Sequence, residues 1–415
     1  MKSKFNFLYE ARTFLVLWLT QSFSALGSAM TGYALVIWSY QQKGSALATS
    51  LLMVCSYAPY VLLSIFAGAL SDRLDKKKIM LGCDAIAAMG TVTILVLMKT
   101  GNLELWHLYL LNALNGFMNT IQQPASDVAT SLVLPKKYYQ KVGGLRYLSN
   151  SVNSILTTVI ATAFVAFAGI DFVLFFDLGT FAVAFVTLLI FIKIPEAEKS
   201  ESKKETFFES AKTKLSYLMQ NRGIFDLIIF LAFINLTASL FEAAFPAMIL
   251  SRSGGGETVL GTVNAFRGVT MLVGSFIASA FKKPKNRVKV ICYTLLFSMS
   301  FENFMLAFGR NVWVWCGAEF LGWILIPLMS TNLDAIMREN VPVEIQGRVF
   351  SARNILQFFT IPVGYFFGGF FVDKVYEPFM STQKSGSFFI KMFGSGKGSG
   401  AAFFFFTIAF LGIFT

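Results

Sequence analysis

The stretch Gly68-Ala-Leu-Ser-Asp72-Arg73-Leu-Asp75-Lys76-Lys77-Lys78 is a short charged segment between two long apolar runs, at about 46–69 and 79–98. A run of roughly 20 apolar residues crosses the hydrocarbon core of a bilayer as one helix. A charged loop of this length between two such runs therefore predicts a membrane hairpin whose turn lies at one membrane surface.

The same pattern continues in both directions along the chain. We count twelve apolar runs, and the alternating signature of a membrane β-barrel is absent. The prediction is an all-α integral membrane protein with twelve transmembrane helices, of which the last is expected to be truncated. The runs lie at about 13–40, 46–69, 79–98, 105–134, 142–168, 171–192, 223–250, 257–281, 288–308, 311–337, 347–372 and 401–415.

Composition agrees with a membrane protein. The chain of 415 residues is 55% hydrophobic and only 14% charged, and its mean hydropathy is +0.62. Soluble domains carry about 25% charged residues. These values exclude a soluble enzyme, a disordered chain and a small secreted domain built on disulfides.

The basic residues lie mostly on one side of the predicted spans. With a cytoplasmic N-terminus, 26 of the 35 Lys and Arg residues fall on the inner side, 8 on the outer side and Arg267 within a span. Excess basic charge marks cytoplasmic loops. The bias predicts a multi-pass protein of the cytoplasmic membrane with its N-terminus inside, and it makes nucleic-acid binding a poor explanation of the net charge of +12.

Six runs precede residue 193 and six follow residue 222. We expect an N-terminal six-helix bundle at 1–192, a cytoplasmic linker at 193–222 and a C-terminal six-helix bundle at 223–415. In the linker, Phe208, Ala211, Leu215 and Leu218 have helical spacing, which indicates an amphipathic helix on the membrane surface. A plain solvated linker is the alternative.

The two halves also share a local pattern. Asp127 precedes Pro135 by eight residues after the fourth run, and Asp334 precedes Pro342 by eight residues after the tenth. This signal is weak alone, but two parallel repeats of six helices would produce it.

The stretch 68–78 resembles the G-x-x-x-D-R-x-G-R-K-K loop of the major facilitator superfamily, which lies between the second and third of twelve helices. Asp75 stands where the family commonly has Gly. Three further stretches resemble the macrolide-efflux-like branch of this family: Gln123-Pro124-Ala125, Phe191-Ile-Lys-Ile-Pro195 and Gly347-Arg348-Val-Phe-Ser351. The resemblance implies the major facilitator fold and a secondary transporter of the alternating-access type, with export as the leading direction.

The same loop predicts an inner gate. Gly68 allows two helices to approach closely, and Arg73 can reach an acid such as Asp127. The resemblance places Asp72 against the start of span 11, near Gly347, where a carboxylate meets a positive helix end. Arg348 and Asp334 complete the predicted gate; a simple anchor of positive charge is the alternative for the lysine run.

Two features of many proton antiporters in this family are missing. Asn115 stands where span 4 of those proteins carries an Arg, and the fifth span has neither Gly nor Pro between Val152 and Ala166. The resemblance therefore supports transport more firmly than it supports proton antiport.

Four ionisable residues lie deep in predicted spans, where each costs about 2.5–3.5 kcal/mol on insertion scales. Glu242 and Arg267 form either an ion pair that fixes helix packing or part of a substrate or proton site. Glu302 and Glu319 are candidates for proton binding, with solvation at the headgroups as the alternative. Acids near helix ends, such as Asp84 and Asp177, are expected to be solvated.

Polar residues in the spans are candidates for a substrate cavity, although a helix–helix hydrogen bond explains each equally well: Gln21, Tyr33, Asn112, Asn115, Asn119, Asn235, Asn264 and Asn332. In span 11, Pro362 and Gly364 mark either a moving gate helix or a static kink.

The sequence contains no motif for nucleotide binding, for a disulfide framework or for a metal site. The phosphate loop G-x-x-x-x-G-K-[ST] does not occur, and the four cysteines have neither a disulfide framework nor the spacing of a metal site. We expect no cofactor, no metal, no bound nucleotide or nucleic acid, and no enzymatic activity.

The leading hypothesis is a proton-driven exporter of amphipathic or macrolide-like small molecules that works as a monomer in the lipid bilayer. A nutrient symporter or uniporter, and a non-transporting receptor or scaffold, are the alternatives.

Overall fold

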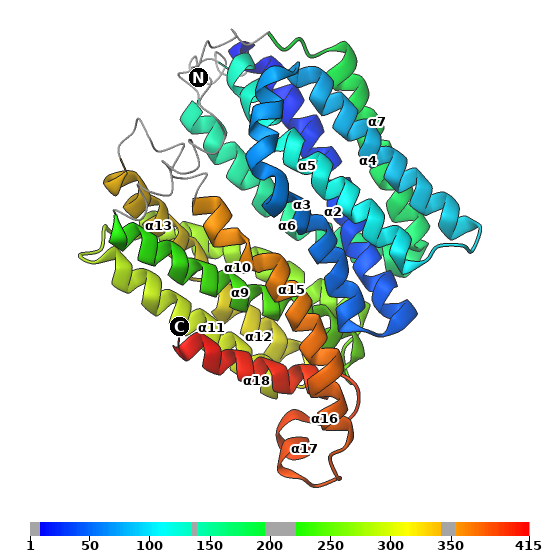
Figure 1. Cartoon of the computed structure of the whole chain (residues 1–415), viewed down its shortest axis with the longest axis vertical. Helices are drawn as coiled ribbons and strands as arrows, with labels where there is room; N and C mark the ends of the chain where they lie inside the picture. Colours follow the sequence, from blue (N-terminus) through cyan, green and yellow to red (C-terminus); the bar gives the residue numbers. More distant parts are fainter. Residues whose placement is uncertain (1–8, 135–138, 196–220, 342–352, 415) are drawn as a thin grey trace. The chain divides into compact units, whose positions relative to one another are not determined.

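The computed structural model describes residues 9–134, 139–195, 221–341 and 353–414, without the side chains of 64–73, 139–148, 150, 151, 338 and 414. All regular structure in these ranges is helical (Figure 1). Nine helices in the described ranges are long and apolar enough to cross a membrane. The predicted all-α membrane fold is therefore confirmed.

The chain divides into two compact units, residues 1–42 with 55–199 and residues 43–54 with 200–415. The division passes through α3 (Ala46–Arg73), whose first two turns pack with the second unit. The predicted linker lies mostly in 196–220, outside the described residues, and so does its predicted surface helix.

The first unit is built around α4, which packs against α5 and α7, while α6 packs against α7. Apolar side chains of α2, α4, α5 and α7 form a shared core that includes Leu17, Met80, Met118 and Leu188. Besides the rest of α3, its helices are α2 (Arg12–Lys43), α4 (Lys76–Lys99), α5 (Leu105–Val133), α6 (Tyr139–Ala168) and α7 (Ile170–Ile190).

In the second unit α9 packs against α10, α15 and α18, and α11 packs against α12, α13 and α18. Gly364 and Gly368 of α15 allow close packing, because a Cβ on either would overlap atoms of α9. Its longer helices are α9 (Arg222–Ser251), α10 (Glu257–Ala280), α11 (Arg287–Phe308), α12 (Val312–Trp323), α13 (Ile326–Asn340), α15 (Thr360–Phe371) and α18 (Ser399–Phe414).

The predicted span 311–337 is found as the apolar stretch Val312–Met337, but its helix is interrupted. Helix α12 ends at Trp323, and α13 begins at Ile326, with Pro327 in its first turn. Proline has no N–H to continue the helical hydrogen bonds. The carbonyl of Ile324 at the break lies against Gly274 of α10, where a Cβ would overlap it. The break ends α12 at Trp323, a residue of the charged cluster described below.

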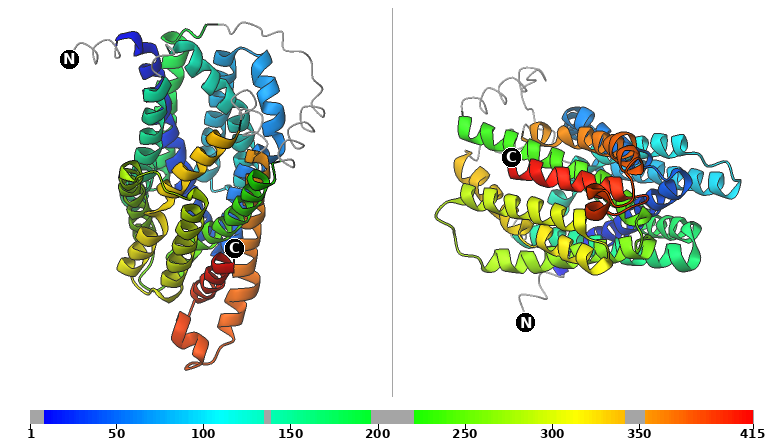
Figure 2. Two further views of the ribbon diagram at one scale, coloured as in Figure 1. Left: turned by 90° about the vertical axis from the view of Figure 1, so that its left-hand side faces the viewer. Right: turned by 90° about the horizontal axis from the view of Figure 1, so that it is seen from below.

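Beyond α15 the helix continues as a π-helical turn, η2 (Val372–Tyr376), and as α16 (Glu377–Ser381), after which the chain turns back through α17 (Phe388–Phe393) to α18 (Figure 2). Two acids of this segment, Asp373 and Glu377, form hydrogen bonds to the starts of other helices. Asp373 accepts hydrogen bonds from the backbone N–H of Ala46 (3.0 Å) and of Leu47 (2.9 Å) at the start of α3. Glu377 accepts from the N–H of Gly398 and Ala401 at the start of α18.

Candidate functional site

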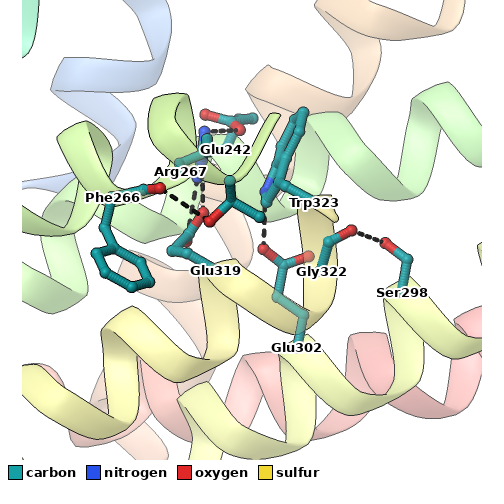
Figure 3. Close-up of polar contacts among 9 residues, drawn as sticks. Glu242, Phe266, Arg267, Ser298, Glu302, Glu319, Gly322 and Trp323 are labelled. Carbon is teal, nitrogen blue, oxygen red and sulfur yellow. Dashed lines mark hydrogen bonds and ion pairs between the residues drawn. The ribbon is translucent and has the colours of Figure 1, made fainter. Parts of the chain in front are cut away.

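A cluster of charged side chains lies inside the second unit, with Arg267 of α10 at its centre (Figure 3). Arg267 Nη1 lies 2.6 Å from Glu242 Oε1 of α9. On α12, Glu319 receives two bonds from the same guanidinium, 2.5 Å from Nε to Oε2 and 3.2 Å from Nη2 to Oε1. Three helices are therefore joined through one arginine.

The cluster is shielded from solvent to different degrees. The side chain of Glu319 is 0% exposed, that of Arg267 13% and that of Glu242 28%. Removing one partner of a buried ion pair leaves an uncompensated charge at a cost of about 3–5 kcal/mol. Arg267 and Glu319 are thus mutually dependent, whereas Glu242 is the more accessible member.

Aromatic rings enclose the guanidinium. Its carbon lies 4.6 Å from the ring centroid of Trp323, 5.1 Å from that of Phe245 and 5.6 Å from that of Phe241. Arginine over aromatic faces gains roughly 0.5–2 kcal/mol per contact, most where water is excluded. The sequence does not single out these three residues, because aromatic side chains occur throughout this chain and carry no signal of their own.

Glu302 of α11 belongs to the same cluster. Glu302 is 6% exposed, and Trp323 Nε1 donates a hydrogen bond of 2.9 Å to its Oε1. Gly322 makes room for this carboxylate, because a Cβ there would overlap it. Burial removes headgroup solvation as an explanation for Glu302 and Glu319.

A second polar region lies wholly within the first unit, as a hollow of about 970 Å³. A stripe on α5 at spacings of three and four residues lines it: Asn112, Asn115, Asn119, Gln122 and Ser126. These polar residues explain why α5, although 29 residues long, is not among the nine apolar helices. Gln21 also lines the hollow, so four of the predicted cavity residues lie together.

Two acids of this hollow are residues that sequence analysis expected to be solvated. Asp177 of α7 is only 4% exposed and accepts hydrogen bonds from Ser28 (3.0 Å), Thr31 (3.0 Å) and Thr91 (3.1 Å). That expectation was wrong for Asp177, because hydroxyls from α2 and α4 replace water around it. The available signal was a set of hydroxyl residues within otherwise apolar helices.

Asp84 of α4 is half-buried and lies between two side-chain amides. Gln122 Nε2 donates to Oδ1 at 2.6 Å, and Gln21 Nε2 donates to Oδ2 at 3.4 Å. The carboxylate therefore faces the hollow beside α2 and α5 and is not immersed in solvent at a helix end.

The remaining predicted cavity residues do not line this hollow. Tyr33 accepts a hydrogen bond from Thr162 at 3.4 Å, and Asn235 donates to the carbonyls of Leu231 and Gln357. Asn332 is 3% exposed and accepts from Arg287, and Asn264 is half-buried on α10.

The predicted gate is described only in part. Asp127 lines the hollow of the first unit, and Asp334 Oδ1 lies 3.9 Å from Arg353 Nη1 in the second. The surroundings of Gly68, the side chains of Asp72 and Arg73, and all of Gly347 and Arg348 are outside what the structure describes. Pro362 is in the first turn of α15, two residues before Gly364 meets α9.

Metal-binding groups of three or more His, Cys, Asp or Glu residues are absent from the described part of the chain. The cysteines at 55, 83, 292 and 316 are free thiols. The charge chemistry of both regions is therefore that of carboxylates, one guanidinium and neutral hydrogen-bond donors.

Comparison with known proteins identifies the family. The sequence model of the Major Facilitator Superfamily matches residues 17–365. Macrolide efflux protein A of Streptococcus pyogenes is 23% identical over 367 residues, which cover 87% of this chain and 90% of that protein. Macrolide efflux protein A of Enterococcus faecalis is 24% identical over 326 residues, with coverages of 77% and 99%.

The fold is also found in solved structures. A crystal structure of a mutant of the nucleoside transporter NupG superposes with a TM-score of 0.67 and 13% identity, and it covers 96% of this chain and 98% of that one. The family, its members' transport activity and the helical spans agree with one another. The chain therefore belongs to the Major Facilitator Superfamily and is a multi-pass membrane transporter, not an enzyme.

Proposed function

We propose that this transporter exports amphipathic, macrolide-like small molecules across the cytoplasmic membrane in exchange for protons. It acts as a monomer by alternating access, with its N-terminus in the cytoplasm. The direction and the compound class rest on the relatives named macrolide efflux protein A, which match most of this chain. Such an exporter is a proton antiporter. By lowering the concentration of the compound in the cell, it confers drug resistance.

The observation that supports proton coupling is the charge balance of the Arg267 cluster. Three carboxylates lie in this cluster with one guanidinium: Glu242 and Glu319 contact Arg267 directly, and Glu302 is bonded to Trp323 beside it. Glu302 and Glu319 are almost fully buried. Uncompensated charge is costly in a membrane interior. Neutrality of the cluster requires protons on the acids that Arg267 does not balance.

Glu302 is the member best suited to carry the proton. Its one hydrogen bond among the described residues comes from the neutral indole of Trp323, whereas Glu242 and Glu319 both contact Arg267 directly. A carboxylate without a bonded cation is neutral at lower cost than a paired one. Loss of its proton adds a negative charge that competes with the other two acids for Arg267.

The competition supplies a physical link between proton movement and helix movement. Arg267, Glu242, Glu302 and Glu319 come from α10, α9, α11 and α12. A change of partner at Arg267 therefore changes the forces among four helices of one unit. This is the two-state element that coupling needs.

The test uses the purified chain in liposomes with an imposed pH gradient and a radiolabelled macrolide. Glu302→Gln, which keeps shape and hydrogen bonding but not the titration, is expected to lower gradient-driven accumulation by about tenfold or more, the usual scale for a lost proton-transfer group. Counterflow exchange without a gradient is expected to remain near the wild-type rate.

Asp226→Asn is the matched control, because Asp226 is an exposed acid near the start of α9 in the same unit. Unchanged gradient-driven accumulation in Glu302→Gln would refute Glu302 as the coupling residue. Accumulation in the opposite direction would support the nutrient importer, and absence of any gradient-driven transport would remove the proton from the proposal.

A further inference from the structure

The hollow of the first unit differs from the Arg267 cluster in the sign of its charge. Asp84, Asp127 and Asp177 all contribute to its lining. None of the described residues that line it is a lysine, an arginine or a histidine. Its volume of about 970 Å³ is of the size that holds drug-sized ligands, for which roughly 300–1,000 Å³ is usual.

The two better-defined acids of the hollow are not equivalent. Asp177 is 4% exposed and already accepts from three hydroxyls, which bind it to α2 and α4. Asp84 is half-buried and accepts one bond on each oxygen. Because an ionised carboxylate has about four acceptor positions, Asp84 keeps capacity for a further partner.

Two other polar atoms of the lining have no partner among the described residues. They are the indole Nε1 of Trp18, a donor, and the side-chain Oδ1 of Asn115, an acceptor, and both atoms are buried. Buried polar atoms in native proteins almost always have a hydrogen-bond partner. Both residues contribute to the lining of the hollow, so its wall holds one unused donor and one unused acceptor.

The apolar part of the lining suits a ring-bearing or alkyl group. Phe14, Trp18, Leu111 and Phe181 contribute to the same hollow. Aromatic faces bind both apolar surface and cationic nitrogen. The hollow thus combines an acid, unpartnered polar atoms and aromatic surface.

We propose that this hollow binds amphipathic organic cations, such as compounds that carry a protonated or quaternary amine, and that Asp84 is the charge that recognises them. Gln21 and Gln122 hold the Asp84 carboxylate in place, and the aromatic side chains receive the apolar part of the ligand. That such a cation is the transported substrate rests on the proposed function; that it binds here does not.

The experiment measures equilibrium binding to the full-length chain in lipid nanodiscs. The probes are a fluorescent aryl-alkyl trimethylammonium compound and its neutral analogue, in which carbon replaces the quaternary nitrogen. We expect the wild type to bind the cation about tenfold or more tighter than the neutral analogue, as for a charge-assisted contact in a partly buried site. Asp84→Asn is expected to bring the two affinities within about twofold by weakening only the cation.

Two more variants keep the test decisive if Asp84→Asn misfolds. Asn115→Lys leaves Asp84 and its amides intact but adds a positive charge to the lining, and it is expected to abolish the preference for the cation. Asp84→Glu is expected to retain it. Asp171→Asn, which removes a partly exposed acid paired with Lys99 in the same unit and outside the lining of the hollow, is the control with an unchanged preference.

A cation preference that survives in both Asp84→Asn and Asn115→Lys, or that is absent in the wild type, overturns this inference. The outcome is separable from the proposed function. Proton-driven transport of the neutral analogue without any preference for the cation leaves the proposed function standing alone. An Asp84-dependent preference without gradient-driven transport leaves only the binding site standing.

Discussion

The Arg267 cluster and the hollow beside Asp84 are both acidic regions within membrane helices, but they compensate their acids differently. In the second unit, Arg267 contacts Glu242 at 2.6 Å and Glu319 at 2.5 Å. In the first unit, Asp84 and Asp177 receive only amide and hydroxyl donors among the described residues.

The difference in how the acids are compensated decides how each region responds to a change of charge. Arginine stays charged at all physiological pH values, so a cluster built on it redistributes a fixed positive charge when an acid gains or loses a proton. Neutral donors stabilise a carboxylate without cancelling its charge. A bound cationic ligand can therefore still neutralise it. The first arrangement fits the proposed coupling, and the second fits the proposed recognition of a positively charged ligand.

The largest expected effect comes from removing the fixed cation. Arg267→Leu leaves Glu319, whose side chain is 0% exposed, with no positive partner in the part of the chain that the structure describes. We expect the free energy of unfolding to fall by about 3–5 kcal/mol, the range for breaking a buried ion pair. Denaturant unfolding of the detergent-solubilised chain, followed by tryptophan fluorescence, measures it.

The paired control for Arg267→Leu adds Glu319→Leu. If the cost arises from an uncompensated acid, the double variant recovers most of the lost stability, because an apolar pair replaces a buried ionic pair at little net cost. A double variant as unstable as the single one would instead assign the loss to packing around Trp323 and Phe245.

A smaller effect is expected from the acid that has only neutral donors. Asp177→Ala leaves the hydroxyls of Ser28, Thr31 and Thr91 without their acceptor. Hydrogen bonds between membrane helices average roughly 0.6 kcal/mol each, so the loss is about 2 kcal/mol. Asp177→Asn keeps an acceptor oxygen and is expected to lose less than about 1 kcal/mol by the same principle.

The same unfolding assay compares the two Asp177 variants. Equal destabilisation by alanine and asparagine would mean that the charge of Asp177, and not its hydrogen bonds, holds α7 to α2 and α4. Such a result would weaken the contrast between the two regions.

The smallest effect is expected at an exposed ion pair, which sets the baseline for both regions. Hydrogen bonds from Lys283 and Arg287 lower the pKa of Glu339, at the end of α13, from its ordinary value of 4.5. A lowered pKa in the folded state means that the pair stabilises above the ordinary value and loses this effect as pH falls through the folded value.

We therefore expect Glu339→Gln to differ slightly from the wild type in melting temperature at pH 7 and not at all at the acid end of the range. High salt is expected to remove the difference, because exposed charges are screened. A difference that grows toward acid pH would contradict this sign. The wild type and Glu339→Gln are compared in parallel melts from pH 7 downward.

Much of the fold follows from local sequence. The positions of the spans depend on the length of each apolar run, and most of the predicted runs begin and end within a few residues of a helix in the described ranges. The run at 347–372 is an exception, because its helix continues to Ser381. The break at 324–325 was missed, although Pro327 marks it, because a proline in a long apolar run also permits an unbroken kinked helix.

For the candidate site, the sequence predicts only which charged residues lie deep within the predicted spans. Glu242, Arg267, Glu302 and Glu319 stand out because charge is rare in apolar runs. Their partners do not, because the rotation and packing of each helix decide which side chains meet. Trp323 is recognisable as part of the site only in the structure, where the end of α12 places it against Glu302 of α11 and Arg267 of α10.

The sequence by itself determined the membrane-spanning helices, the asymmetry of basic charge and the family, since each depends on composition or on contiguous residues. Tertiary structure alone decided that Asp177 is buried among hydroxyls, that Asp84 faces a hollow, and that two glutamates contact one arginine while a third lies beside it on Trp323. The physical reason is that the environment of a charge depends on the helices packed around it, and those contacts join residues distant in the chain.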